Sequence, residues 1–186
     1  AVVKTRGHPA IGEAMWIVAA AAFGGSIALV GQMYHLSGDE SSAVLTWCAG
    51  TALAAAALRS NPVTVAAVGI ADGWLLMNLL GGFRLFGKTY FPHLFVVVAV
   101  ILFALSYWTR SRAARHLILL SLILYAALFA LDNNVVAVSL ALAVVSAALF
   151  AASVLAPAAV ERIVQLGGGM PLQALIGFLT GMAMLQ

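Results

Sequence analysis

The feature that most constrains this chain is a series of long apolar stretches that carry almost no charge. Seven of them follow one another, at residues 11–34, 43–58, 62–80, 94–108, 117–131, 135–155 and 170–186. Each is close to the ~20 residues that an α-helix needs to cross a hydrocarbon layer about 30 Å thick. The strands of a membrane barrel are shorter and alternate in polarity, which these stretches do not. Because backbone groups in lipid must be paired within the segment, the stretches are predicted to be transmembrane helices.

The composition excludes a water-soluble fold. Of the 186 residues, 64% are hydrophobic and 8% are charged, and the mean hydropathy is +1.09, whereas a soluble domain carries about 25% charged residues. We therefore expect an all-α protein: a polytopic transmembrane helix bundle of about seven helices, forming a single domain over residues 1–186. The connectors are short, so neighbouring helices should be antiparallel. The N- and C-terminal residues are compatible with the cut ends of a longer chain.

The positions of the basic residues predict how the bundle is oriented. Arg84 and Lys88 lie in one connector, and the other seven basic residues lie on the opposite side: Lys4, Arg6, Arg59, Arg110, Arg112, Arg115 and Arg162. Because Lys and Arg are retained on the cytoplasmic side, the N-terminus is predicted to be cytoplasmic and the C-terminus outside. The run from Arg110 to Arg115 is interpreted as a topology anchor in contact with anionic lipid headgroups.

Two short patterns bear on how the helices pack. Two turns on the basic side contain an Arg-Ser pair, Arg59-Ser60 and Arg110-Ser111, which suggests an internal duplication. Small residues recur at four-residue spacing and would let helix backbones approach closely, either within this bundle or in a dimer. These are Ala143, Ala147, Ala151, Gly177 and Gly181.

Polar residues inside or beside the apolar stretches are the candidates for function, because they are costly to bury in hydrocarbon without a partner. Gln32, His35 and Asp39 would share one face if the first helix continues through them, and Tyr34 lies in the same segment. Asp72 lies ten residues after Pro62, so it should sit roughly 15 Å into its helix, near the membrane midplane.

Further polar residues are expected on the outer side of the membrane. Asn78 follows Asp72 towards that side, and Arg84 and Lys88 lie in the aromatic connector beyond it. This connector is interpreted as an interfacial loop on the outer leaflet. Alternatively, it is a lid over an outward-facing pocket, in which Arg84 or Lys88 meets an anionic headgroup or neutralises Asp39 or Asp72.

Familiar enzyme and cofactor signatures do not occur in the sequence. Cys48 is the only cysteine, so there is no intrachain disulfide and no thiolate cluster. His35, Asp39, Asp72 and His93 are metal-ligand types, but they lack a metal-binding spacing. We expect no catalytic residue, no metal and no cofactor, and we favour a protein that is not an enzyme. The net charge of +3 follows membrane topology, so no nucleic-acid partner is expected.

The segment from Ile27 to Asp39, with Trp47 and the turn Leu58-Arg59-Ser60, resembles a known family. This is a bacterial family of predicted membrane proteins, the domain of unknown function 2157. Its members show a Gly-Gln-x-Tyr-(His or Gln)-x-x-Gly-Asp signature, a tryptophan in the next helix and an Arg-Ser turn. The resemblance covers about residues 24–62. It implies a multi-pass protein of the bacterial inner membrane, without an established reaction, and members are usually longer with more helices.

Three functions remain open at this stage. The first is a carrier or binding protein for a small molecule or lipid, with a polar pocket open to the periplasmic side. Its predicted binding residues are Gln32, Tyr34, His35, Asp39, Asp72, Asn78, Arg84 and Lys88. The second is a structural or assembly subunit of a larger membrane complex. The third is an intramembrane enzyme on lipid-linked substrates, with His35 as base and Asp39 orienting it. Membrane lipids are the expected partners, with other membrane subunits or a second copy of the chain as further candidates.

Overall fold

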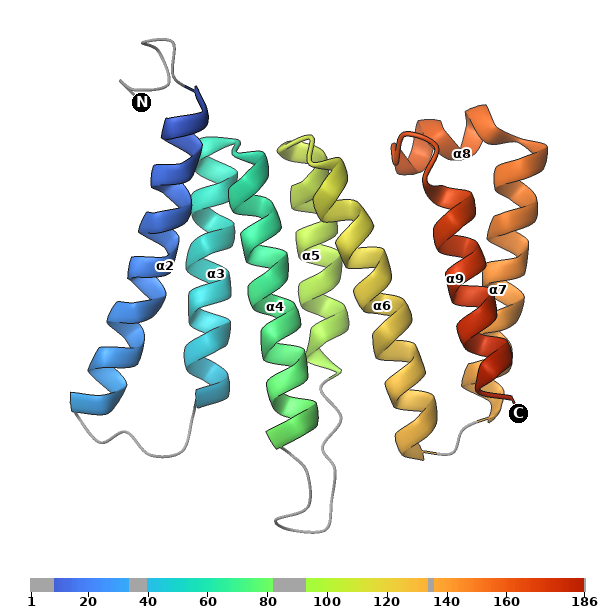
Figure 1. The fold of residues 1–186 in the computed structure, drawn as a ribbon, viewed down its shortest axis with the longest axis horizontal. Coiled ribbons are helices and arrows are strands. Elements are labelled where there is room, and N and C mark those ends of the chain that lie inside the picture. Colours follow the sequence, from blue (N-terminus) through green and yellow to red (C-terminus); the bar gives the residue numbers. More distant parts are fainter. Residues whose placement is uncertain (1–8, 34–39, 82–92, 134–135, 186) are drawn as a thin grey trace. The chain divides into compact units, whose positions relative to one another are not determined.

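A computed structural model describes residues 9–33, 40–81, 93–133 and 136–185. These residues form eight α-helices and no strand (Figure 1). The helices are α2 (Pro9–Met33), α3 (Glu40–Leu58), α4 (Asn61–Gly81), α5 (Leu94–Trp108), α6 (Arg112–Asn133), α7 (Val136–Leu155), α8 (Pro157–Val164) and α9 (Met170–Ala183). The predicted all-α class is therefore confirmed.

Several of these helices have the length and composition of membrane spans. Four are long and apolar enough to cross a bilayer: Ala10–Met33, Ser41–Leu58, Arg112–Ala130 and Val136–Leu155. Two shorter helices, α5 and α9, are also apolar. The number of crossings and the sides on which the termini lie stay predictions.

The chain divides into two compact units, Ala1–Ala114 and Arg115–Gln186. The helix α6 begins in the first unit and continues in the second. The single domain expected over residues 1–186 stays a prediction.

In the first unit, α4 packs against α2, α3 and α5. Its inner face is formed by small and apolar residues that are almost fully buried, among them Ala67, Ala71 and Leu75. The contact between α2 and α3 depends on glycine. The Trp47 ring occupies the space that a Cβ on Gly24 would need, and the Phe23 ring occupies the space that a Cβ on Gly50 would need. Large rings therefore fill the notches that glycine leaves on the facing helix.

In the second unit, α7 and α9 pack side by side. A Cβ on Gly181 would lie 2.8 Å from the backbone nitrogen of Ala143, and one on Gly177 would collide with Ser146. The predicted close approach through Ala143, Gly177 and Gly181 thus occurs within the chain. Ala147 and Ala151 are exposed and do not belong to this contact, because the buried face of α7 follows Ser139, Ala143, Ser146 and Ser153.

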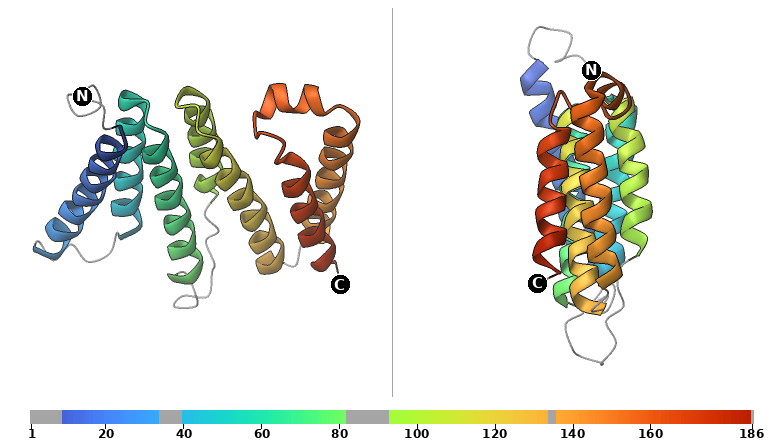
Figure 2. Two further views of the ribbon diagram at one scale, coloured as in Figure 1. Left: turned by 45° about the horizontal axis from the view of Figure 1, so that its top comes forward. Right: turned by 90° about the vertical axis from the view of Figure 1, so that its right-hand side faces the viewer.

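The helix α8 is an element that the sequence analysis did not expect. The chain leaves α7 at Ala156, whose φ and ψ of −135° and 59° are not helical, and Pro157 starts the new helix. Proline suits the first turn because that turn needs no N–H donor. As a result α8 lies crosswise to α7 and α9 at one end of the unit (Figures 1 and 2).

Candidate functional site

The structure describes three of the eight predicted binding residues. Gln32 is exposed in the last turn of α2, whereas Asp72 and Asn78 are half-buried on α4. The other five lie outside the described residues: Tyr34, His35, Asp39, Arg84 and Lys88. The distance between His35 and Asp39, on which the enzyme hypothesis depends, is therefore untested.

Asn78 joins the end of α4 to the start of α3. Trp74 Nε1 donates a hydrogen bond to Ser41 Oγ at 2.8 Å, and Ser41 Oγ donates to Asn78 Oδ1 at 3.1 Å. The Asn78 amide closes the circuit by donating to the Trp74 carbonyl oxygen at 2.7 Å. Asn78 Oδ1 thus links α4 to α3, while the amide nitrogen bonds within α4. Sequence reasoning named Asn78 but missed Ser41, because no local pattern marks a serine as its partner.

Asp72 lies near the middle of the 21-residue helix α4. The side chain is half-buried, and its Oδ1 atom is enclosed by protein. Helical spacing puts Gly69, Gly73 and Leu76 on the neighbouring face, and all three are exposed. A Cβ on either glycine would have no neighbour within 4 Å. Beside this enclosed atom the two glycines leave the α4 backbone uncovered, and we call this stretch the Asp72 notch (Gly69, Asp72, Gly73 and Leu76).

The two Arg-Ser turns have the same backbone geometry. Arg59 and Arg110 have left-handed φ angles of 47° and 54°. The following serines, Ser60 and Ser111, donate their N–H to the carbonyl oxygen five residues earlier, at 3.2 and 2.9 Å, which closes the preceding helix. Each serine Oγ then accepts the N–H three residues later, at 3.5 and 3.1 Å, and so caps the next helix. The two Arg-Ser pairs thus form turns with the same backbone conformation and the same hydrogen bonds.

Side chains connect these two turns to each other. The Arg59 guanidinium carbon lies 4.1 Å from the centroid of the Trp108 ring, a cation–π contact. Trp108 Nε1 donates to the Ala56 carbonyl oxygen at 3.1 Å, and Thr64 Oγ1 donates to Thr109 Oγ1 at 2.9 Å. The ends of α3, α4 and α5 are therefore held together by polar contacts.

Glu13 adds α2 to this assembly. The Ser60 hydroxyl donates to Glu13 Oε2, and Ser60 is fully buried. A carboxylate near the start of a membrane-length helix thus has a partner on the facing turn. The sequence analysis did not single out Glu13, although an acidic residue in an otherwise apolar helix was the available signal.

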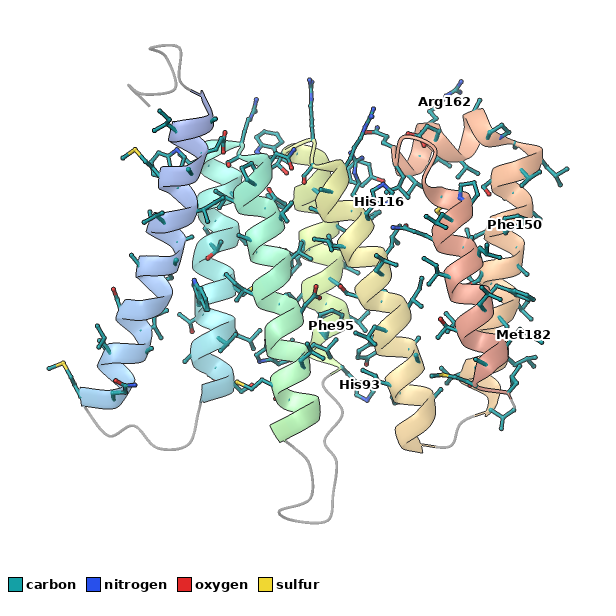
Figure 3. The ribbon with its side chains drawn as sticks, viewed as in Figure 1. His93, Phe95, His116, Phe150, Arg162 and Met182 are labelled. Atoms are coloured by element: carbon teal, nitrogen blue, oxygen red, sulfur yellow. The ribbon has the colours of Figure 1, made fainter. Side chains whose placement is uncertain are left out.

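The second unit contains a polar cluster around His116, which lies near the start of α6 and is labelled in Figure 3. Gln173 Nε2 donates to His116 Nδ1 at 2.8 Å and to the His116 carbonyl oxygen at 3.0 Å. His116 Nε2 lies 3.1 Å from the Leu166 carbonyl oxygen. Because the amide N–H can only donate, Nδ1 accepts and Nε2 carries the proton. The imidazole is thus held between α9 and the connector that precedes it.

Arg115 corrects one sequence prediction. We expected it to contact lipid headgroups together with Arg110 and Arg112, but it is only 2% exposed. Its Nη1 donates to Gln165 Oε1 at 3.1 Å and reaches the Val164 carbonyl oxygen at 3.4 Å. The reason is helical spacing: Arg115 is one turn into α6 and faces the connector, whereas Arg110 and Arg112 are exposed in the turn.

These clusters differ in what they can do. Amide, hydroxyl and imidazole groups in most of them bind one another and tie helices together. The Asp72 notch differs in that a half-buried carboxyl side chain adjoins uncovered glycine backbone. Within the described ranges, no group of three or more His, Cys, Asp and Glu residues could hold a metal ion.

Residues 1–64 match the model of a family described as Predicted membrane protein (DUF2157). The resemblance stated from the sequence is therefore confirmed for this segment, which contains α2, α3 and the first Arg-Ser turn. Neither the curated proteins nor the solved structures contain a significant match to the chain. Together with the apolar helices, the family match shows a membrane protein whose helices are able to span a bilayer.

Proposed function

We propose that this chain is a non-enzymatic carrier or binding protein of the bacterial inner membrane, with Asp72 as its charged contact for a small polar molecule. One observation carries the proposal: the Asp72 carboxyl group stands beside a notch in which two glycines leave the helix backbone uncovered. Ionisable groups inside membrane helices are expensive to bury and usually mark a pathway or a binding site.

The surrounding geometry supports a preformed site. The inner face of α4 is packed by Ala71 and Leu75, and the circuit of Ser41, Trp74 and Asn78 holds the adjacent end of the helix. Such packing fixes the position of Asp72 on α4. In this proposal the site faces the periplasm, and the remaining predicted binding residues complete it there.

The same notch also favours a second function, that of an assembly subunit. Exposed glycines four residues apart allow another helix to approach closely in lipid. Gly69 and Gly73 have this spacing. An assembly subunit would use the notch for packing, so removing the charge of Asp72 would leave its assembly intact. The same change would abolish the activity of a carrier.

Replacing Asp72 by Asn tests the carrier function. The purified chain is reconstituted in liposomes that contain a pH-sensitive dye, and small amines, amino acids and sugars are added one at a time. We expect pH-dependent uptake of at least one of these solutes by the wild type. Asp72→Asn should abolish that uptake, because the amide keeps the shape of the side chain but cannot carry charge or a transferable proton.

Two controls make the result specific. Asp72→Glu keeps the charge and should retain part of the uptake, and equal thermal unfolding in detergent shows that Asp72→Asn is folded. Labelling with a hydrophobic carbodiimide should modify Asp72, detected by peptide mass, because the notch is open. Unchanged uptake by Asp72→Asn, or failure of the reagent to modify Asp72, would contradict the carrier proposal.

A further inference from the structure

The helix α8 presents no buried residue, although it is fixed at both ends. Pro157 starts it, and at its other end Arg115 binds the Val164 carbonyl oxygen and the side chain of Gln165. A positive charge suits the carbonyl end of a helix. An eight-residue helix held in this way keeps a defined surface, because neither end is left to fray.

The single acidic residue of α8 is used within the unit. Glu161 accepts hydrogen bonds from the N–H groups of Gly167 and Gly168, at 2.5 and 3.1 Å. Both glycines have left-handed φ angles, of 63° and 82°, which shape this turn around the carboxylate. The negative charge of α8 is therefore committed to the connector, and the charge that remains on its outer surface is positive.

The outward side of α8 is amphipathic. Ile163 is 72% exposed, and Leu155, at the bend before the helix, is 84% exposed. Arg162 is exposed as well, and Figure 3 shows its side chain projecting away from α7 and α9. Val160 and Val164, which lie on the side of the helix opposite Arg162, are half-buried. Two large apolar side chains and one cation are thus directed away from the unit.

We propose that α8 is an interfacial helix that lies in the headgroup layer of an anionic bilayer. Ile163 and Leu155 enter the acyl boundary, and the Arg162 guanidinium binds lipid phosphates. A short helix that lies crosswise to membrane-length helices, with an apolar and a cationic outer side, has the features of such an element. This proposal does not depend on Asp72 or on the carrier function.

A fluorescent label at residue 163 tests the proposal. Ile163→Cys is made in a Cys48→Ala background, labelled with bimane, and reconstituted in vesicles of phosphatidylcholine, alone or mixed with equal parts of phosphatidylglycerol. We expect a quencher attached to the lipid to reduce the fluorescence several-fold more than aqueous iodide does. The phosphatidylglycerol vesicles should strengthen this preference, because they supply anionic phosphates.

Arginine variants separate a specific role of α8 from general charge. Arg162→Gln should remove the effect of phosphatidylglycerol on the label, whereas Arg112→Gln, which removes an exposed arginine elsewhere, should leave it. The proposal is overturned if iodide quenches the label better than the lipid quencher does. It is overturned equally if neither quencher reaches the label, since a protein surface would then cover α8, or if both arginine variants behave alike.

Discussion

Individual glycines decide where the helices of the first unit touch. Trp47 lies against Gly24 and also donates its Nε1–H to the Ala20 carbonyl oxygen at 2.8 Å, so both the ring and its polar atom are used. In the second contact the ring is on α2 and the glycine on α3, because Phe23 lies against Gly50. In lipid, where apolar side chains gain little by leaving the solvent, such close packing is a main source of helix association.

The adjacent pair Gly24 and Gly25 offers a matched test of this packing. Gly24→Ala should destabilise the fold by about 1–3 kcal/mol, because its methyl group would overlap the Trp47 ring. Gly25→Ala should be close to neutral, since a Cβ there meets nothing within 4 Å. Thermal unfolding in detergent, followed by tryptophan fluorescence, compares the two. Equal stability of both variants would show that this contact does not hold α2 to α3.

At this scale the sequence placed individual polar residues on a helix but did not give their partners. Asp72 and Asn78 were named from their position in an apolar stretch, and both are half-buried on α4. The partner of Asn78, the burial of Arg115 and the contact between Gln173 and His116 were not predicted. Each of these depends on which helix faces which, and hydropathy alone carries no such information.

Among the elements, the two Arg-Ser turns are the clearest repeated device. Each places an arginine in a left-handed conformation, which costs free energy for a residue with a Cβ, and each closes one helix and caps the next. At the first turn, Ser60 also donates to Glu13 and so adds a contact with α2 to its capping role.

Serine-to-alanine variants measure what each turn contributes to stability. Ser111→Ala removes a cap and should cost about 0.5–2 kcal/mol. Ser60→Ala should cost at least this much, because it removes a cap and the hydroxyl that binds Glu13. Unfolding by titration with sodium dodecyl sulfate in mixed micelles measures both. No cost in either variant would contradict the roles assigned to these turns.

Each of the seven predicted apolar segments overlaps one helix, and these helices are α2 to α7 and α9. Long uniform hydropathy and breakers such as Pro62 mark them in the sequence. The helix α8 was missed, since eight residues are too few to show a helical period inside a connector. The signals that could have found it are Pro157 at its start and the four-residue spacing of Val160 and Val164.

The distribution of side chains over the molecule is that of a protein surrounded by lipid. Among the described residues, hydroxyl groups such as Ser60, Thr64 and Ser106 are fully buried. Large apolar side chains such as Val18 and Leu53 are mostly exposed, at 67% and 72%. In water this arrangement would leave extensive apolar surface uncovered. A bilayer around the helices would cover the exposed apolar side chains, while the hydroxyl groups stay inside the protein. This agrees with the family match and the membrane-length helices.

The most direct test of this account asks on which side of the membrane the basic turns lie. Arg110→Cys and Lys88→Cys are made separately in a Cys48→Ala background, and cells that express each chain are treated with a membrane-impermeant maleimide. Because basic turns are retained in the cytoplasm, residue 88 should be labelled in intact cells, and residue 110 only after lysis. Labelling of residue 110 from outside intact cells would contradict the proposed orientation.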